Sequence, residues 1–362
     1  MDTKLTFKGV NIKAVLAPLP APLRTGSGIL THAPVLLVDI LSKEGVVGLS
    51  YLFSPREDLL KCLKEGIDAI AALLIGREMD PAKVSDYLDS EFRLFGGSGI
   101  LTMARAAIDM AIWDAISKAR GIPLYKFLGG SKSTVSIYQS SGLGIGNIIT
   151  LGGEAQKLIG KEFTAIKLRL GYPRIEDDLK AIKIVREAIG NEIALMVDYN
   201  QCLSSGEALR RCRFLDQFDL TWIEEPIHAE DLEGYASLRQ ELITPLQIGE
   251  NLFSPTEFNR SILMKCSQYL MPDVAKVGGV SNWLTVADLC QRNSIPLSSH
   301  LYPEFSLHLL LSTKKSHYLE YVNWLNAIIE DPIRIEDGVC IPSNLPGVGM
   351  AWTLKLVEKY KI

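Results

Sequence analysis

The chain has 362 residues, of which 47% are apolar and 22% charged, and its formal net charge is −4. This length is too great for one small domain and fits either two domains or a barrel with an appendage. The sequence has no basic run or stripe, so we expect no nucleic-acid partner. Its longest apolar runs, at 35–41 and 69–76, are far shorter than the roughly 20 residues that span a bilayer, so we expect no membrane segment.

The N-terminal stretch MDTKLTFKGVNIKAV alternates polar and apolar residues and lacks the apolar core of a signal peptide. It is typical of an edge strand, and we expect a cytoplasmic protein. Six cysteines lack the CxxC spacing of a zinc site or a disulfide framework, and they are expected to be small core residues with reduced thiols. They are Cys62, Cys202, Cys212, Cys266, Cys290 and Cys340.

Residues 1–130 have the pattern of an α+β domain. Strands are predicted at 4–17 and within 33–53, where the turn Ser42–Gly45 divides a hairpin. Apolar residues then recur at three- and four-residue spacing, which predicts helices. These helices are expected at 56–76, 80–93 and 101–119.

Beyond residue 130, short apolar runs alternate with helical segments. The strands are predicted at 163–170, 193–200, 220–226, 245–251, 269–277, 295–300 and 317–322, and helices among them at 175–189, 207–218 and 255–266. Ser254 and Pro255 are a good N-cap and first residue for the last of these helices. Repeated β-α units predict parallel strands with right-handed crossovers, and this number of them favours a (β/α) barrel. An open doubly wound sheet is the alternative, but no GxGxxG or GxxxxGKS motif supports it.

Charged side chains close the apolar runs, one for each β-α unit. The first are the pair Lys167 and Arg169, and from Asp198 onward they recur at intervals of 20 to 27 residues: Asp198, Glu224, Glu250, Asp273, His300 and Glu320. In a barrel, the C-terminal ends of the strands meet at one face, where the active site lies. The regular spacing therefore predicts that these side chains surround one site.

Three successive carboxylates around one barrel mouth predict a bound cation. They cannot all remain ionised without one. Oxygen ligands without cysteine favour a hard metal, Mg²⁺ first. The predicted ligands are Asp198, Glu224 and Glu250; Glu225 competes with Glu224, because strand alternation turns only one of them inward.

Asp273 and His300 come from neighbouring predicted strands. A carboxylate that orients an imidazole raises its basicity, so this pair is a candidate general base. A base beside Mg²⁺ suits abstraction of a proton α to a carboxylate, with the metal and nearby donors stabilising the enediolate. Glu320 could donate a hydrogen bond to the same substrate carboxylate if crowding raises its pKa and keeps it protonated.

With these residues in place, the sequence resembles the enolase superfamily, and within it the mandelate racemase branch. The motifs that carry the resemblance are IKLRLGYP, MVDYNQ, WIEEP, IGEN, MPDVAKVGG, SSHLYPE and HYLE. The resemblance covers nearly the whole chain. It implies an N-terminal α+β capping domain over 1–130, a modified (β/α)7β TIM-like barrel over 131–324, and a segment over 325–362 that completes the barrel and returns to the cap.

The resemblance also implies roles for individual residues. It places metal ligands at Asp198, Glu224 and Glu250, which favours Glu224 over Glu225. It implies a dyad of His300 with Asp273, an electrophilic Glu320, and a lysine at 167 that contacts the substrate carboxylate. Ser140 stands where the family offers a further carboxylate contact, and a homo-oligomer is implied.

Arg169 departs from the racemase pattern, which has a second lysine there as a base on the other face of the substrate. A guanidinium is effectively always protonated, so this site is expected to work with one base. We therefore predict a lyase of the hydro-lyase class that dehydrates an acid sugar or related 2-hydroxycarboxylate. The alternatives are racemisation or epimerisation of a 2-hydroxy acid, with Arg169 acting as a base beside other cations, and a non-catalytic homologue that binds a carboxylate.

The pocket over the predicted site is expected to be lined from both domains. The candidates are Leu23, Arg24, Ser27 and Leu30 on a first loop, Phe53, and on the barrel side Asn200, Leu301, Tyr302 and Val322. Arg24 could pair with a distal carboxylate or hydroxyls, or lie in solvent. The leucines would suit an aryl group, or they would be core residues if the loop packs differently.

Overall fold

The structure is a computed structural model that describes residues 4–25 and 28–362. Its N-terminal part begins with a three-stranded antiparallel sheet in the order β1 (Phe7–Thr25), β2 (Gly28–Ser42) and β3 (Val47–Phe53). β1 pairs only with β2 within this sheet, so it is the edge strand that the sequence predicts. The expected strand at 4–17 was too short, because β1 continues to Thr25. The prolines at 18, 20 and 22 weaken the strand signal there, and the pairing shifts register across them.

Four helices follow in the cap: α1 (Leu60–Leu74), α2 (Pro81–Glu91), α3 (Ile100–Ala119) and the short α4 (Leu124–Phe127). α3 packs along β3 and against α1. Gly48 of β3 makes this contact possible, since a Cβ there would lie 2.0 Å from the carbonyl oxygen of Ala111. Asp80 caps α2 by accepting a hydrogen bond of 3.1 Å from the amide of Lys83. The sheet is thereby fixed to a helical layer that also reaches the barrel.

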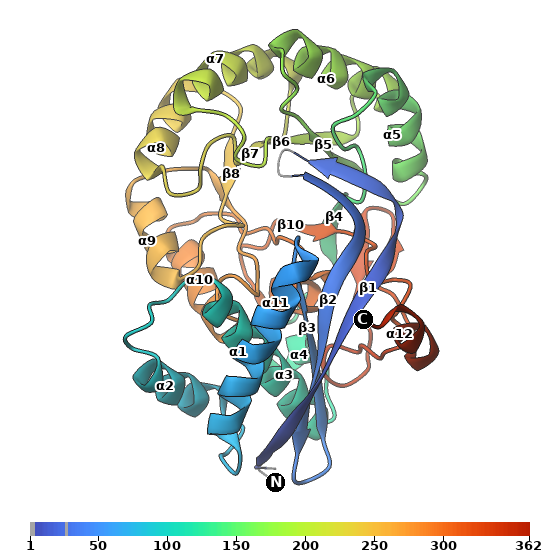
Figure 1. Cartoon of the computed structure of the whole chain (residues 1–362). Coiled ribbons are helices and arrows are strands. Elements are labelled where there is room, and N and C mark those ends of the chain that lie inside the picture. The colour runs from blue at the N-terminus through green and yellow to red at the C-terminus, as the bar shows by residue number, and fades with distance from the viewer. Residues whose placement is uncertain (1–3, 26–27) are drawn as a thin grey trace.

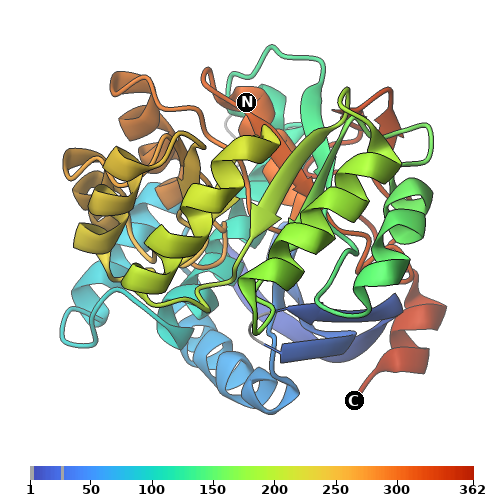
Figure 2. The same cartoon turned by 90° about the horizontal axis from the view of Figure 1, so that it is seen from above.

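The barrel strands lie side by side in chain order, and their helices form the outer arc (Figures 1 and 2). The strands are β4 (Val135–Gln139), β5 (Ala165–Arg169), β6 (Ala194–Asp198), β7 (Ile223–Glu224), β8 (Leu246–Ile248), β9 (Tyr269–Leu270) and β10 (Tyr318–Tyr321). The helices are α5 (Leu151–Ile159), α6 (Ile175–Ile189), α7 (Ser205–Leu215), α8 (Leu232–Glu241), α9 (Pro255–Leu263), α10 (Val280–Arg292) and α11 (Pro303–Ser312). Isolated parallel bridges from Leu270 to Leu297 and from Leu297 to Ser316, and the pairing of β10 with β4, close the ring. The predicted capped barrel is confirmed.

Several barrel strands are shorter than predicted. β7 and β9 have two residues each, and 295–300 forms only isolated bridges. The apolar runs continue past the ends of the ladder because the loops beyond it are themselves buried. Met271 and Val274, for example, lie beyond β9 and are fully buried. Apolar content here reports burial rather than strand length.

The C-terminal segment adds β11 (Arg334–Glu336), β12 (Val339–Ile341) and α12 (Leu354–Tyr360). β12 pairs antiparallel with β4, and the chain then returns to the cap. The amide of Ile362 donates to the carbonyl oxygen of Ala14 at 3.0 Å, and the indole of Trp352 donates to Asp39 at 3.0 Å. The domain limits at residues 130 and 324 remain predictions.

None of the helices in the described part of the chain is long and apolar enough to cross a membrane. Four of the six cysteines are buried, as expected of small core residues, but Cys62 and Cys202 are exposed. Cys62 lies on α1, whose outer face is polar, and Cys202 lies in the loop after β6.

Candidate active site

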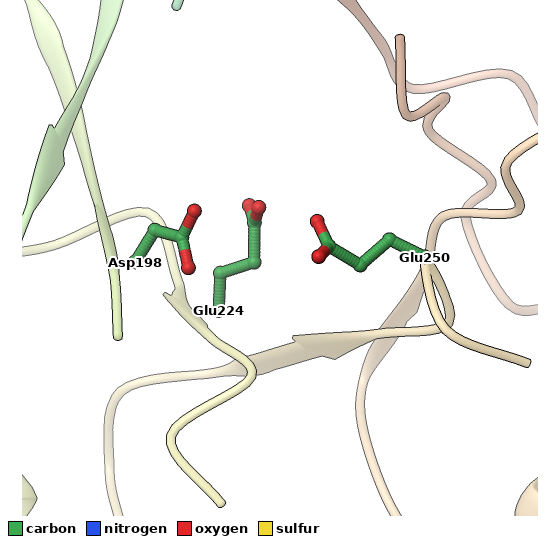
Figure 3. Close-up of side chains that lie close together, drawn as sticks. All are labelled: Asp198, Glu224 and Glu250. Atoms are coloured by element: carbon green, nitrogen blue, oxygen red, sulfur yellow. The ribbon is translucent and has the colours of Figure 1, made fainter. Parts of the chain in front are cut away.

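Three carboxylates from neighbouring strands meet at the mouth of the barrel. Asp198 and Glu224 are the last residues of β6 and β7, and Glu250 follows β8 by two residues. One oxygen atom from each lies within 4.8 Å of the others, and all three side chains are buried. Figure 3 shows the carboxylates turned toward the same space. Parallel strands end at one edge, so the chain order alone brings these groups together.

Neighbouring donors orient this carboxylate cluster. Asn200 donates to Asp198 through its backbone and side-chain amides at 2.7 and 3.0 Å. The indole of Trp222 donates to Oε2 of Glu224 at 2.9 Å. Oε2 of Glu250 is buried and faces Nε2 of His300 at 3.1 Å. The third carboxylate therefore lies between the cluster and the imidazole.

Glu225 points away from this cluster. Its oxygens accept hydrogen bonds from the amide of Gly249 at 3.1 Å and from the side chain of Asn251 at 2.7 Å. Burial, and then the charge of Glu250, raises the pKa of Glu225 to about 7. Alternation along the strand therefore gives Glu224, not Glu225, to the cluster.

The donor set fits a hard divalent cation. All three groups are carboxylates, and among the described residues no thiol or imidazole belongs to this set. Mg²⁺ prefers such oxygen ligands and is held by few carboxylates, its remaining positions being filled by water and substrate.

Lys167 lies at the centre of the acidic groups. Its ammonium contacts Oε1 of Glu224 and lies 2.9 Å from Oε1 of Glu320 and 3.2 Å from Oδ2 of Asp198. Burial opposes the charge, but these carboxylates outweigh it and raise the pKa of Lys167 well above its usual value. The lysine therefore stays protonated, and it offsets part of the negative charge of the cluster.

Arg169 projects from β5 on the same side as Lys167, but it serves a different set of partners. Its guanidinium donates to the carbonyl oxygens of Gly142 and Ser140 at 2.8 and 3.1 Å, and to the hydroxyl of Ser140 at 3.0 Å. The Ser140 hydroxyl in turn donates to Oε1 of Glu320 at 2.7 Å. Nε of Arg169 is buried without a partner in the part of the chain that the structure describes. The guanidinium is therefore held rigidly, and its two terminal nitrogens are engaged with the protein.

His300 and Asp273 form the predicted dyad. Nδ1 of His300 lies 2.8 Å from Oδ2 of Asp273, while Oδ1 of Asp273 accepts the amides of Ala275 and Lys276 at 2.8 and 3.0 Å. The other ring nitrogen, Nε2, lies 3.1 Å from Glu250. Burial lowers the pKa of His300, but the facing carboxylates outweigh it, Glu250 before Glu320, and raise it to about 9. Nε2 is thus the ring nitrogen that faces the carboxylate cluster.

The protonated Glu320 expected from the sequence is not what this structure favours. Burial raises the pKa of Glu320, but Lys167 outweighs it and the net shift is downward. The amide of Leu301 also donates to Glu320 at 2.9 Å. Glu320 is held as an anion because a buried cation touches it.

Two family models match the chain. The model described as mandelate racemase / muconate lactonizing enzyme, N-terminal domain, matches residues 8–129, and the one described as enolase C-terminal domain-like matches 151–355. The chain belongs to the mandelate racemase / muconate lactonizing enzyme family of the enolase superfamily. The resemblance inferred from its motifs is confirmed.

Individual members of this family are similar over most or all of their length. L-talarate/galactarate dehydratase from Salmonella typhimurium is 33% identical, over 96% of this chain and 89% of its own. Among solved structures, an enolase from Bradyrhizobium complexed with magnesium and mandelic acid is 37% identical, with a TM-score of 0.95 and 100% of both chains covered. L-talarate dehydratase from Polaromonas sp. JS666, complexed with Mg and L-glucarate, is 32% identical, with a TM-score of 0.90 over 99% of this chain and 98% of that one.

In this family member, a cavity of about 360 Å³ lies over the carboxylates and has two unlike sides. The barrel side carries the charged groups, among them Lys167, Arg169, His300 and Lys276. The other side is largely apolar and forms what we term the roof of the cavity: Leu23, Phe53, Leu59, Leu63, Ile100, Met103, Leu301 and Trp324. A substrate would therefore place its anionic end on the barrel and its remote end against apolar side chains.

The structure distributes the predicted pocket residues unevenly. Phe53, Asn200, Leu301, Leu23 and Tyr302 line the cavity. Ser140 is buried between Arg169 and Glu320 and does not line it. Val322 lines a separate cavity of about 20 Å³.

The expected first loop is instead the far end of the β1–β2 hairpin, which reaches over the barrel (Figure 1). Arg24 is exposed there, and its backbone carbonyl accepts a hydrogen bond from the amide of Ile145 at 2.8 Å. Leu30 does not line the cavity, and Ser27 lies outside the described residues.

Sequence reasoning missed the roof residues on the helices of the cap and on the C-terminal side of the barrel. Leu59, Leu63, Ile100 and Met103 come from the cap, and Trp324 follows β10. Their only signal is helical or apolar spacing, which a core-facing residue shares.

Proposed function

We propose that this chain is a Mg²⁺-dependent hydro-lyase that abstracts the α-proton of a 2-hydroxycarboxylate and dehydrates it, with an acid sugar or related hydroxy acid as substrate. The observation that carries the proposal is the asymmetry of the site. A hydrogen-bonded His300–Asp273 dyad faces the carboxylate cluster on one side, while the side-chain cation of Arg169 is tied to backbone carbonyls. A two-base racemase needs a base on each face, and a dehydratase needs one.

The protein's own groups divide the work. Nε2 of His300 takes the α-proton, and Asp273 holds the ring through Nδ1. The same imidazolium then gives its proton to the departing β-hydroxyl, which leaves as water, and the enol product becomes a 2-keto-3-deoxy acid. Lys167 pairs with the substrate carboxylate. When Lys167 turns toward that carboxylate, Glu320 loses its cationic partner, and burial then favours the protonated, hydrogen-bond-donating form.

Asp198, Glu224 and Glu250 would hold the metal. Bound there, Mg²⁺ would supply Lewis-acid stabilisation of negative charge on the substrate. Pairing of Glu250 with a cation would also weaken the field that raises the pKa of His300, bringing that group toward the range of a general base.

The relatives support this reaction class. One relative is named L-talarate/galactarate dehydratase, and a solved neighbour named L-talarate dehydratase is complexed with Mg and L-glucarate. The predicted cytoplasmic location and homo-oligomeric state stay predictions, as does the small-molecule hydroxycarboxylate as partner.

The test is proton NMR of the Mg²⁺-loaded protein in D₂O with a panel of aryl and acid-sugar 2-hydroxy acids. Loss of substrate signal with formation of a 2-keto-3-deoxy product is the expected result. Exchange of the α-proton with inversion and no new product would instead establish a racemase. A protein that binds Mg²⁺ and these acids but exchanges no α-proton would be a carboxylate-binding homologue. His300→Asn is the control, and it should abolish whichever proton transfer is observed.

A further inference from the structure

Tyr302 carries a hydroxyl whose hydrogen-bonding capacity is only half used. The amide of Phe53, at the end of β3, donates to this oxygen at 3.0 Å. No acceptor for the hydroxyl proton is found within residues 4–25 and 28–362. The side chain is 2% exposed and lines the main cavity together with His300 and Asp273. A phenol both accepts and donates, so its donor remains for a group in the cavity.

The position of this hydroxyl is fixed from three sides. Leu301 and Tyr302 both have left-handed backbone, with φ of 48° and 49°, which is costly for such residues. The Tyr302 ring stacks on Tyr51 at a centroid distance of 4.9 Å, and the Tyr51 hydroxyl donates to Glu304 at 2.6 Å. The cap thus holds Tyr302 in place two residues after the proposed base. A strained, over-determined side chain at a ligand cavity is typical of a preorganised binding group.

The Asp273 carboxylate does not need the Tyr302 hydroxyl as a hydrogen-bond donor. Oδ1 of Asp273 accepts two backbone amides, and Oδ2 faces His300. Burial and the charge of Asp273 raise the pKa of Tyr302 well above its usual value, so it remains a donor at any ordinary pH. Because the Tyr302 hydroxyl stays protonated beside His300, it can donate a hydrogen bond to a substrate oxygen that departs during the reaction.

We propose that Tyr302 is a substrate-binding residue whose hydroxyl donates a hydrogen bond to the oxygen on the β-carbon of the substrate. The inference rests on the proposed function, which places the carboxylate at Lys167 and the α-carbon at His300 Nε2. We place the β-carbon on the cap side of His300, where Tyr302 lines the cavity together with Phe53, Leu301 and Trp324. The substrate is accordingly a 2,3-dihydroxy acid whose remote end is apolar enough for the roof.

The experiment compares two acids that differ in the β-oxygen alone: 2,3-dihydroxy-3-phenylpropanoate and 2-hydroxy-3-phenylpropanoate. Dissociation constants are measured by calorimetry with Mg²⁺-loaded His300→Asn, in which chemistry is stopped, with and without Tyr302→Phe. We expect the dihydroxy acid to bind about tenfold more tightly, as one hydrogen bond in a closed site provides. Tyr302→Phe should erase that preference and leave the affinity of the monohydroxy acid unchanged.

Tyr51→Phe is the matched control, since it also removes one buried hydroxyl from the stacked pair but lies outside the main cavity. It should lower stability and keep the preference. Equal affinities in the protein that retains Tyr302 would overturn the proposal without any further variant. So would equal weakening of both acids by Tyr302→Phe, which would mean that the hydroxyl serves a water in the neighbouring cavity of about 20 Å³.

A second measurement distinguishes failure of the proposed function from failure of the role assigned to Tyr302. The monohydroxy acid has no β-hydroxyl to lose, so exchange of its α-proton in D₂O by protein with intact His300 reports on the base alone. Exchange without a β-oxygen preference would refute the role of Tyr302 only. Absence of exchange and of binding for both acids would remove the proposed function and the inference with it.

Discussion

Replacing Arg169 by lysine should supply the base that the second face of the site lacks. Arg169 makes three hydrogen bonds to Gly142 and Ser140, two of them to backbone carbonyls. A lysine ammonium lacks the planar fork and would keep one of them. At about 1.5 kcal/mol for each lost bond to a charged group, we expect Arg169→Lys to lower the free energy of unfolding by about 3 kcal/mol.

The same change should alter stereochemistry. An ammonium buried beside Lys167 has its pKa lowered by that neighbour, and a neutral amine can accept a proton. The wild type is expected to exchange the α-proton of one enantiomer of a 2-hydroxy acid in D₂O, and Arg169→Lys that of both. Proton NMR on each enantiomer separately measures this, and chemical denaturation measures the loss of stability.

Arg186→Lys is the matched control, because Arg186 also donates to backbone carbonyls, those of Gly190 and Ile193, but lies on α6 away from the cavity. It should cost stability and leave the stereochemistry unchanged. Equal exchange of both enantiomers by the wild type would refute the one-base argument, since a base would then already act on the second face.

Further predictions concern metal binding, the roof of the cavity and the loss of folding stability at low pH. Glu250→Gln should weaken Mg²⁺ binding by a hundredfold or so, and Glu225→Gln much less, as calorimetry would show. Met103→Lys should shift preference from aryl acids toward diacids, measured as a ratio of dissociation constants; an unchanged ratio would mean that the roof does not contact the substrate. Burial lowers the pKa of His308 to about 4, so this group stabilises the fold fully above pH 6.5 and loses that stability as pH falls toward 4. Without metal, His308→Gln should remove about 3 kcal/mol of the loss and leave the share of His317, whose pKa burial also lowers to about 4, whereas His32→Gln, at an exposed position, should leave the whole loss in place.

The arrangement of the site was largely predictable because one charged group closes each β-α unit. Parallel strands of a barrel end at one face, so the spacing of Asp198, Glu224 and Glu250 already implies their proximity. The spacing in the sequence could not decide whether Glu224 or Glu225 joins the cluster. It depends on which residue the last rung of β7 turns inward, and the structure turns Glu225 to Gly249.

The charge state of Glu320 and the roof could not be predicted for a different reason. Both depend on contacts between segments far apart in the sequence. Glu320 is an anion here because Lys167, from another strand, lies 2.9 Å away. Ile100 and Met103 begin a helix of the cap whose buried side could equally face its own core. Likewise, three prolines concealed the far end of the β1–β2 hairpin, so Arg24 was placed on a loop.

The two cations of β5 explain why this site is chemically one-sided. Lys167 and Arg169 lie two positions apart on this strand and both are buried, but their partners differ in kind. Lys167 pairs with side-chain carboxylates and makes no backbone hydrogen bond within the described residues, so its ammonium can turn to a substrate carboxylate when one arrives. Arg169 donates to backbone carbonyls at 140 and 142, so moving it would break both of these hydrogen bonds. Proton transfer is therefore left to His300, and the reaction that one base can complete alone is elimination of the β-hydroxyl, whose oxygen Tyr302 is placed to receive.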